Sequence, residues 1–199
     1  MEQEKALSIK EDARIVRTKR DLANALEELL KEKSIEDISI KDITDRALIS
    51  KNTFYNNFED KNELLVFLFE RYEQSLLEEV KPILDKTFYP TRIITFKKAL
   101  EAIVHFFSTT DLPFEQMIAN DRSRVLFYSL TSFIVDVLTR IEKNYDKLLS
   151  RRINPDIAIP FYAGAYASTI YLLYKNHHTK IEEKQLLSEL MKLSMPAIE

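Results

Sequence analysis

Apolar residues recur along this chain at helical spacing, and each apolar stretch ends at a short polar break. The first stripe places leucine or alanine at i, i+3, i+4, i+7 and i+8 and predicts an amphipathic helix over about residues 12–33. Similar stripes predict helices over about 61–81, 93–107, 114–119, 123–149 and 155–174, and a last helix that carries Leu186, Leu190 and Leu193. Breaks are expected at 111–113 and 176–183. The pattern predicts an all-α fold.

The stretch SIKDITDRALISKNTFYNNF, residues 39–58, reads as two short capped helices joined by a tight turn. Ser39 and Asp42 have the spacing of a capping box, in which each side chain accepts from the other's backbone N–H. Ser50 can cap the second helix, where Phe54 and Phe58 at i and i+4 face inward. This arrangement predicts a helix-turn-helix.

The outward face of the second helix is polar, rich in amides and nearly free of acid. Its residues are Lys51, Asn52, Thr53, Tyr55, Asn56 and Asn57. Asparagine can read adenine edges through paired hydrogen bonds, while Thr, Tyr and Lys suit phosphates. The face is therefore typical of a helix that enters the major groove of DNA. The alternative is an ordinary surface helix over a small core.

Basic residues cluster just before the first apolar stripe, as Arg14, Arg17, Lys19 and Arg20. A first helix in front of a helix-turn-helix crosses the DNA backbone near this point, so the cluster is a candidate phosphate contact. Lys61 lies in the first turn of the helix that Asp60 caps, where free N–H groups attract an anion. A solvated charged face and an exposed lysine without a partner are the respective alternatives.

Composition narrows the class of protein. The 199 residues are 45% hydrophobic and 31% charged, with one glycine and six prolines, which favours long helices over hairpins. The formal net charge of −3 requires any contact with nucleic acid to come from local positive surface. There is no cysteine, no signal-peptide pattern and no apolar run of membrane-spanning length. We expect a cytoplasmic protein without disulfides that does not contact a membrane.

Catalytic and metal-binding chemistry finds little support. The three histidines, His105, His177 and His178, lack the spacing of metal ligands, and no convincing carboxylate pair accompanies them. The sequence has no phosphate-binding glycine loop, no G-x-S-x-G elbow and no cysteine nucleophile. We expect neither an enzyme nor a cofactor or metal.

The C-terminal part offers two sets of candidates. Aromatic residues could line an apolar effector pocket, or simply fill the core: Phe106, Phe127, Tyr128, Tyr162 and Tyr166. Small and leucine side chains could build a two-fold helical interface, or pack within one chain: Ala163, Gly164, Ala167, Ile170, Leu186, Leu190 and Leu193.

Residues 17–65 resemble the N-terminal DNA-binding domain of the TetR family of bacterial transcription regulators. The resemblance rests on RTKRDL, ALEELL, ISIKDITDRALIS, KNTFYNNF and DKNELL in this order and spacing. It implies that Thr53 and Tyr55 hold phosphates, that Lys51 and Asn52 begin the groove contacts, and that Lys61 touches the backbone. Leu48 and Asn52 depart from the family pattern, because Leu48 replaces the usual turn glycine and Asn52 a small residue.

The resemblance implies a DNA-binding domain over 1–62 and a helical regulatory and dimerisation domain over 63–199. We expect a homodimeric repressor that a small-molecule effector releases from its DNA operator. The alternative is an activator or co-regulator whose C-terminal domain binds a protein partner. The expected DNA-binding residues are Arg17, Thr18, Ser39, Lys41, Ser50, Lys51, Asn52, Thr53, Tyr55, Asn56, Asn57 and Lys61.

Overall fold

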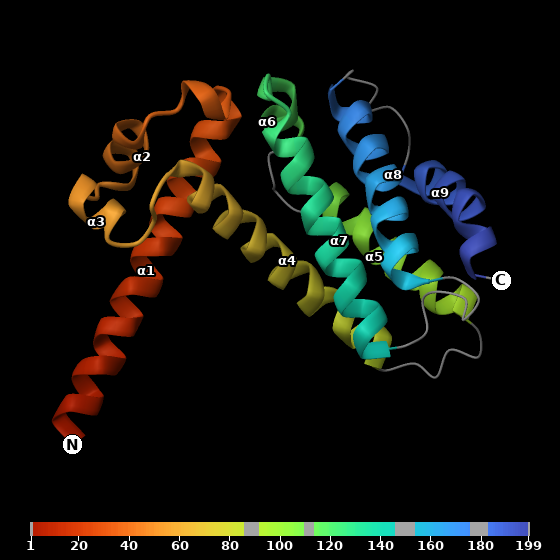
Figure 1. The fold of residues 1–199 in the computed structure, drawn as a ribbon, viewed down its shortest axis with the longest axis horizontal. Helices are drawn as coiled ribbons and strands as arrows, with labels where there is room; N and C mark the ends of the chain where they lie inside the picture. The colour runs from red at the N-terminus through yellow and green to blue at the C-terminus, as the bar shows by residue number, and fades with distance from the viewer. Residues whose placement is uncertain (1, 86–91, 110–113, 146–153, 176–182, 199) are drawn as a thin grey trace. The chain divides into compact units, whose positions relative to one another are not determined.

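A computed structural model describes residues 2–85, 92–109, 114–145, 154–175 and 183–198. Over these ranges the chain forms nine α-helices and one 3₁₀ helix, without a strand (Figure 1). The expected all-α fold is confirmed. The expected break at 111–113, most of the break at 176–183, and residues 146–149 of an expected helix lie outside the described residues.

The chain divides into two compact units. Unit 1 comprises Met1–Leu68 and Asn120–Ser123, and unit 2 comprises Phe69–Ala119 and Arg124–Glu199. The division at Leu68 comes six residues after the boundary expected at residue 62, and the inclusion of 120–123 in unit 1 was not expected. Each unit is described separately below.

Unit 1 is built on α1 (Glu2–Glu32), which begins about ten residues before the predicted start. Its apolar stripe is buried, with Leu22 and Leu26 fully inaccessible and Leu30 at 1% exposure. The 3₁₀ helix η1 (Ile35–Asp37) follows, and then α2 (Ile40–Ala47) and α3 (Lys51–Tyr55). Phe54 completes the core with 0% exposure.

The caps of α2 and α3 match their sequence signals. The Ser39 hydroxyl accepts the N–H of Asp42 at 3.1 Å, and the Asp42 carboxylate accepts the N–H of Ser39 at 2.9 Å, so the capping box is complete. Hydrogen bonds from the Ser39 backbone, Lys33 and the Ser39 hydroxyl hold the pKa of Asp42 well below its usual range. On α3, Ser50 Oγ accepts the N–H of Thr53 at 3.1 Å.

The turn between α2 and α3 contains a left-handed residue. Leu48, with φ 56° and ψ 40°, ends α2 and directs its N–H to the carbonyls of Asp45 and Thr44. Its side chain is 93% exposed, so no packing compensates for the backbone conformation. A branched side chain in this region costs about 1–2 kcal/mol that a glycine would not incur.

α4 (Lys61–Asp85) contributes Lys61–Leu68 to unit 1 and its remainder to unit 2. Asp60 Oδ1 accepts the N–H groups of Asn62 and Glu63 at 2.8 and 2.9 Å, which starts the helix. Lys61 Nζ donates to the carbonyls of Ile35, Glu36 and Ile38 at 2.6, 3.2 and 2.8 Å. One ammonium group therefore satisfies the carbonyls of the η1 turn.

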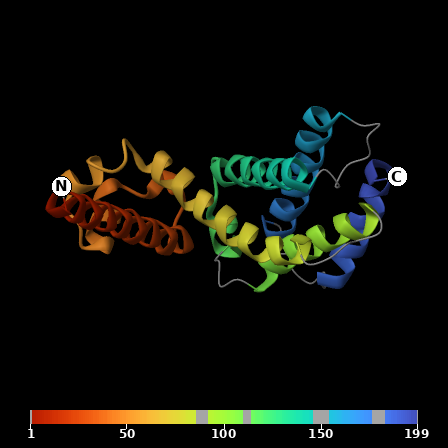
Figure 2. The ribbon, with the colours of Figure 1, turned by 90° about the horizontal axis from the view of Figure 1, so that it is seen from below.

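Unit 2 contains α5 (Arg92–Thr109), α6 (Phe114–Asn120), α7 (Val125–Tyr145), α8 (Pro155–Lys175) and α9 (Glu183–Ile198). α7 packs along α8 (Figure 1), and α5 packs along α9 (Figure 2). The part of α4 in this unit contributes Phe69 and Tyr72, whose rings lie 6.5 and 5.5 Å from that of Phe114 on α6. An aromatic cluster thus forms part of the core.

Buried polar side chains take part in contacts between helices of unit 2. Tyr166 Oη and Ser194 Oγ are 2.5 Å apart, and the serine hydroxyl lies 2.7 Å from the Leu190 carbonyl, which ties α9 to α8. Burial raises the pKa of Tyr166 to about 12 despite the bond to Ser194. Glu73 on α4 is 5% exposed and pairs with Arg140 on α7 at 2.7 Å. Burial raises the pKa of Glu73, and Arg140 only partly offsets this effect.

Replacing Leu48 by glycine tests the strain in the turn. We expect Leu48→Gly to raise the free energy of unfolding of unit 1 by about 0.5–1 kcal/mol, because relief at positive φ exceeds the added entropy of the unfolded chain. Urea unfolding followed by circular dichroism measures the change. Ala47→Gly at the end of α2 is the matched control and should destabilise by about 0.5–1 kcal/mol. If Leu48→Gly and Ala47→Gly lower the free energy of unfolding equally, the backbone at Leu48 is not strained.

Replacing Lys61 by methionine tests the role of its ammonium group. Lys61→Met should lower the free energy of unfolding of unit 1 by about 1–2 kcal/mol, because it leaves the η1 carbonyls without their charged donor. The dependence of DNA affinity on salt should keep its slope, which binding assays at several salt concentrations measure. If the free energy of unfolding is unchanged and the slope of log DNA affinity against log salt becomes shallower by about one, Lys61 instead contacts a DNA phosphate.

Candidate nucleic-acid interface

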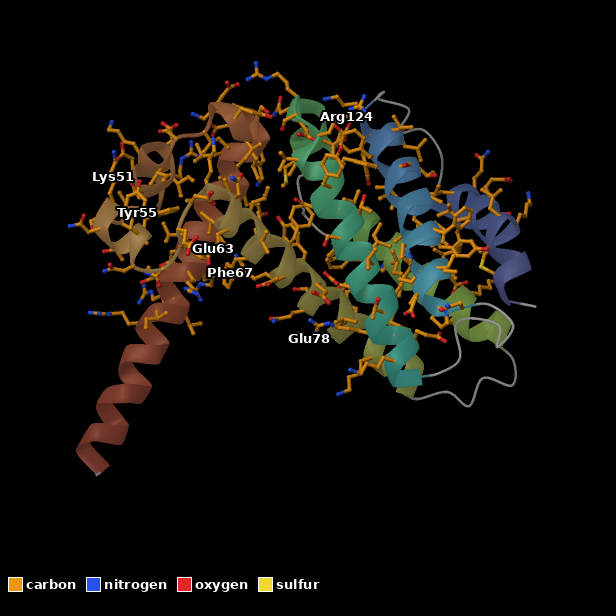
Figure 3. All side chains as sticks on the ribbon, viewed as in Figure 1. Lys51, Tyr55, Glu63, Phe67, Glu78 and Arg124 are labelled. Atoms are coloured by element: carbon orange, nitrogen blue, oxygen red, sulfur yellow. The ribbon has the colours of Figure 1, made fainter. Side chains whose placement is uncertain are left out.

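The outward face of α3 carries four exposed side chains, those of Lys51, Asn52, Tyr55 and Asn56. Figure 3 labels Lys51 and Tyr55 at α3. Tyr55 is 57% exposed, and its ring packs edge-on against the buried Phe54 at 5.6 Å, which limits its freedom. α3 contains no acidic residue. The face offers one cation, amides and a phenol without local repulsion of phosphate.

The remaining polar residues of this segment also stabilise it. Thr53 and Asn57 are half-buried, and Asn57 Nδ2 donates to the Thr53 carbonyl at 2.7 Å, which satisfies a carbonyl of α3. The Ser50 and Thr53 hydroxyls lie 2.9 Å apart at the start of α3. These contacts explain how so short a helix is held. The predicted DNA contacts of Ser50, Thr53 and Asn57 remain predictions.

The basic residues of α1 differ in their surroundings. Arg14, Arg17 and Arg20 are exposed, and Arg17 and Arg20 lie 3.8 and 3.4 Å from the carboxylate of Asp21, in ion pairs open to solvent. Lys19 instead lies over the rings of Phe58 and Phe67, 5.2 and 5.7 Å from their centroids. The arginines are therefore more available to an anion than Lys19 is.

The other predicted contacts have internal partners as well. Lys41 is exposed and pairs with Asp45 at 3.3 Å, an interaction of little energetic weight at the surface. Thr18 is half-buried, and Ser39 is occupied by its capping box. The ammonium group of Lys61 binds three carbonyls inside unit 1, so a phosphate would have to compete with them. Its predicted DNA contact is untested.

Sequence reasoning missed residues 120–123, which join unit 1 from far along the chain. Asn120 Nδ2 donates to the Lys31 and Leu30 carbonyls at 2.9 and 3.4 Å, and Arg122 pairs with Asp37. Burial alone would raise the pKa of Glu36, but hydrogen bonds from Ser123 and Ser34 and the charge of Arg122 lower it to about 2. These contacts join residues about 90 positions apart, so no local sequence pattern predicts them.

The aromatic side chains expected to form an effector pocket are spread over different environments. Phe106 is fully buried, Tyr166 is buried and bonded to Ser194, and Tyr128 is 67% exposed. Phe127 contacts the ring of Tyr128 at 5.5 Å, and Tyr162 contacts that of Tyr166 at 6.1 Å. Their role as a pocket remains a prediction.

A cleft of about 370 Å³ opens elsewhere in unit 2, between the end of α7 and the start of α8. It is lined by Val135, Thr139, Glu142, Lys143, Pro155, Asp156, Ile159 and Pro160. None of the five predicted aromatic residues is among them.

The residues expected at a dimer interface separate into buried and accessible ones. Ala163 and Ala167 are fully buried within unit 2, and Ile170 and Leu190 are 5% and 3% exposed. Gly164 and Leu186 are half-exposed, and Leu193 is 71% exposed. α8 also presents large apolar side chains that were not predicted: Ile157, Phe161 and Leu172, at 70%, 68% and 54% exposure.

The described residues contain no group of three His, Asp or Glu side chains that could hold a metal ion. His105 is exposed, and His177 and His178 lie outside the described ranges. By length and composition alone, α8 meets the requirements of a membrane-crossing helix, with a mean hydropathy of 1.2. The core helix of a soluble protein passes the same test.

Comparison with known proteins adds independent findings. Residues 19–66 match the family model described as bacterial regulatory proteins, tetR family. The HTH-type dhaKLM operon transcriptional activator DhaS of Lactococcus lactis subsp. lactis (strain IL1403) is 34% identical over 62 residues, which are 31% of this chain. The match spans 33% of the length of that relative.

Solved structures share the fold at low sequence identity. The TetR transcriptional regulator from Streptococcus agalactiae 2603V has a TM-score of 0.59 and 21% identity, over 94% of this chain and 98% of that one. The dihydroxyacetone kinase operon activator DhaS has a TM-score of 0.53 and 17% identity, over 92% and 97%. Residues 19–66 are thus similar to the helix-turn-helix segment of the TetR family of bacterial regulatory proteins, and the all-α fold is shared with solved regulators of that family.

Proposed function

We propose that this protein is a homodimeric repressor that binds a specific DNA operator and is released from it by a small-molecule effector. The exposed, acid-free face of α3 on a fully capped helix-turn-helix carries the proposal. Regulators of this fold are not enzymes, and we propose no catalytic activity, metal or cofactor for this chain. A cytoplasmic location follows from access to DNA.

We assign the recognition of DNA bases to α3. Asn52 and Asn56 are exposed and can pair with adenine edges, whereas Lys51 and Tyr55 suit phosphates at the groove edge. Arg14, Arg17 and Arg20 on α1 add positive charge in the same unit. In a dimer, two copies of α3 would enter successive major grooves about 34–36 Å apart on a near-palindromic site.

The exposed stripe of α8 supports dimerisation. Ile157, Phe161 and Leu172 recur at spacings of four and eleven residues, so they share one face, with Gly164 beside them. Gly164 is the chain's one glycine, and a Cβ at this position would meet nothing within 4 Å. Packing within the chain therefore gives no reason for a residue that costs a helix about 1 kcal/mol. A partner helix that approaches closely explains both features.

The alternative is an activator or co-regulator whose C-terminal part binds a protein partner. The relative from Lactococcus lactis is named a transcriptional activator, although it matches this chain only over 62 residues. Binding assays with DNA that flanks the protein's own gene, followed by addition of candidate effectors, separate the two proposals. Release by a small molecule supports the repressor, and an unchanged complex that activates a reporter supports the alternative.

Replacing Lys51 by alanine tests the DNA face. Lys51→Ala should weaken operator binding and make the slope of log affinity against log salt shallower by about one, because one phosphate contact is lost. Fluorescence anisotropy at several salt concentrations measures both quantities. Lys192→Ala removes an exposed lysine from α9 and is the matched control, with no expected effect. If the slope of log affinity against log salt is unchanged in Lys51→Ala, the proposed contact between Lys51 on α3 and a DNA phosphate is wrong.

Replacing Gly164 by leucine tests the dimer face. Gly164→Leu should weaken dimerisation at least about tenfold while the chain stays folded, because a Cβ at this half-exposed position meets nothing within 4 Å in its own chain, whereas a leucine would keep a partner helix at a distance. Light scattering at micromolar concentration and circular dichroism provide the two measurements. Gln74→Leu adds an exposed leucine on α4 and should remain dimeric. A monomeric wild-type protein would contradict the proposal directly.

A further inference from the structure

Two exposed asparagines lie one helical turn apart on the outward face of α3. Asn52 is in the helix and Asn56 directly follows it, and the N–H of Asn56 donates to the carbonyl of Asn52 at 3.0 Å. Within the described residues, neither side-chain amide has a hydrogen-bond partner. Each amide therefore presents both a donor and an acceptor to a molecule outside the chain.

Asn57, the next residue, is held differently. Its side chain is half-buried, and its Nδ2 donates to the Thr53 carbonyl at 2.7 Å. An asparagine that reads adenine uses both ends of its amide, because Nδ2 donates to N7 of the base and Oδ1 accepts from the N6 amino group. Since one end of the Asn57 amide serves α3 itself, Asn52 and Asn56 are the better-placed readers, and Asn57 is a matched control of the same residue type.

The other side chains of this segment offer little to a G·C pair. Guanine is read in the major groove by arginine or lysine, and cytosine by aspartate or glutamate. Residues 51–58 contain no arginine and no acidic residue, and Lys51 is their one cation. The hydrogen-bonding chemistry of the exposed face therefore fits A·T pairs better than G·C pairs.

The spacing of the two amides fixes the spacing of the bases that they can reach. Residues four positions apart on an α-helix are separated by about 6 Å along its axis. Neighbouring base pairs of B-DNA are separated by about 3.4 Å. For a helix that lies along the major groove, Asn52 and Asn56 thus reach base pairs about two steps apart.

We propose that each half-site of the operator contains two A·T pairs about two steps apart, one read by Asn52 and the other by Asn56. The adenine of each pair can stand on either strand. Asn57 stabilises α3 and selects no base. This inference rests on the proposed function, because it requires α3 to enter the major groove, and it adds the bases that the helix selects there.

Selection of binding sequences from randomised duplex DNA by the full-length chain tests the base preference. The wild-type protein should select two A·T positions per half-site, about two steps apart. Asn52→Ala should lower the preference for A·T over G·C about fivefold or more at one position, and Asn56→Ala at the other. Asn57→Ala should change the affinity for all sequences alike and leave both preferences intact. Circular dichroism verifies that each variant is folded.

Base analogues in the selected duplex separate reading of the adenine edge from an effect of DNA shape. 7-Deazaadenine lacks the N7 acceptor and should weaken binding of the wild-type protein about threefold to tenfold at either position. At its own position it should cost nothing further in the variant that lacks the reading asparagine. 2,6-Diaminopurine leaves the major-groove edge unchanged and adds an amino group in the minor groove, so binding should stay within about twofold.

The outcomes distinguish this inference from the proposed function. Selective binding with G·C pairs at the positions that respond to Asn52→Ala and Asn56→Ala would overturn the inference and leave the proposed function intact. The same holds if neither variant alters the selected sequence, or if 7-deazaadenine has no effect on the wild-type protein. A folded wild-type protein that selects no DNA sequence would overturn the proposed function, and the inference with it.

Discussion

The hydrogen bonds that satisfy the carbonyls of η1 hold the turn between α1 and α2 against the start of α4 in unit 1. Lys61 supplies one ammonium group to three of these carbonyls, and without it they would be left without a charged donor at the edge of the core. η1 connects α1 to α2, so its position determines how the helix-turn-helix lies against α1. A lysine that resembles a phosphate-binding residue thus acts within the protein as a structural anchor.

The helix-turn-helix combines strong local signals with one unfavourable residue. α2 begins at the capping box of Ser39 and Asp42, and α3 begins at the cap of Ser50. The buried side chain of Phe54 packs α3 against the core. Leu48 nevertheless adopts the left-handed conformation that a glycine would take without strain. The turn keeps its geometry because the helices on either side impose it, and its cost is borne by the stability of the unit.

α8 is apolar on two of its faces. Its buried face places small side chains, Ala163 and Ala167, against the rest of unit 2, while Tyr166 binds Ser194 on α9. Its opposite face carries exposed Ile157 and Phe161. A helix that is apolar on both faces packs into its own unit and still leaves apolar side chains exposed, which we propose to be a surface for a second chain. This explains why the sequence alone did not distinguish core residues from candidate interface residues.

The sequence by itself determined the all-α class, the order of the helices, both caps of the helix-turn-helix and its outward face. These features depend on residues within about four positions of one another, where periodicity and capping chemistry act. Only the tertiary structure decided which carbonyls Lys61 and Asn120 would satisfy, and which face of α8 would be buried. Those outcomes depend on donors and acceptors that are tens of residues apart and meet only after the helices have packed, so no local pattern records them.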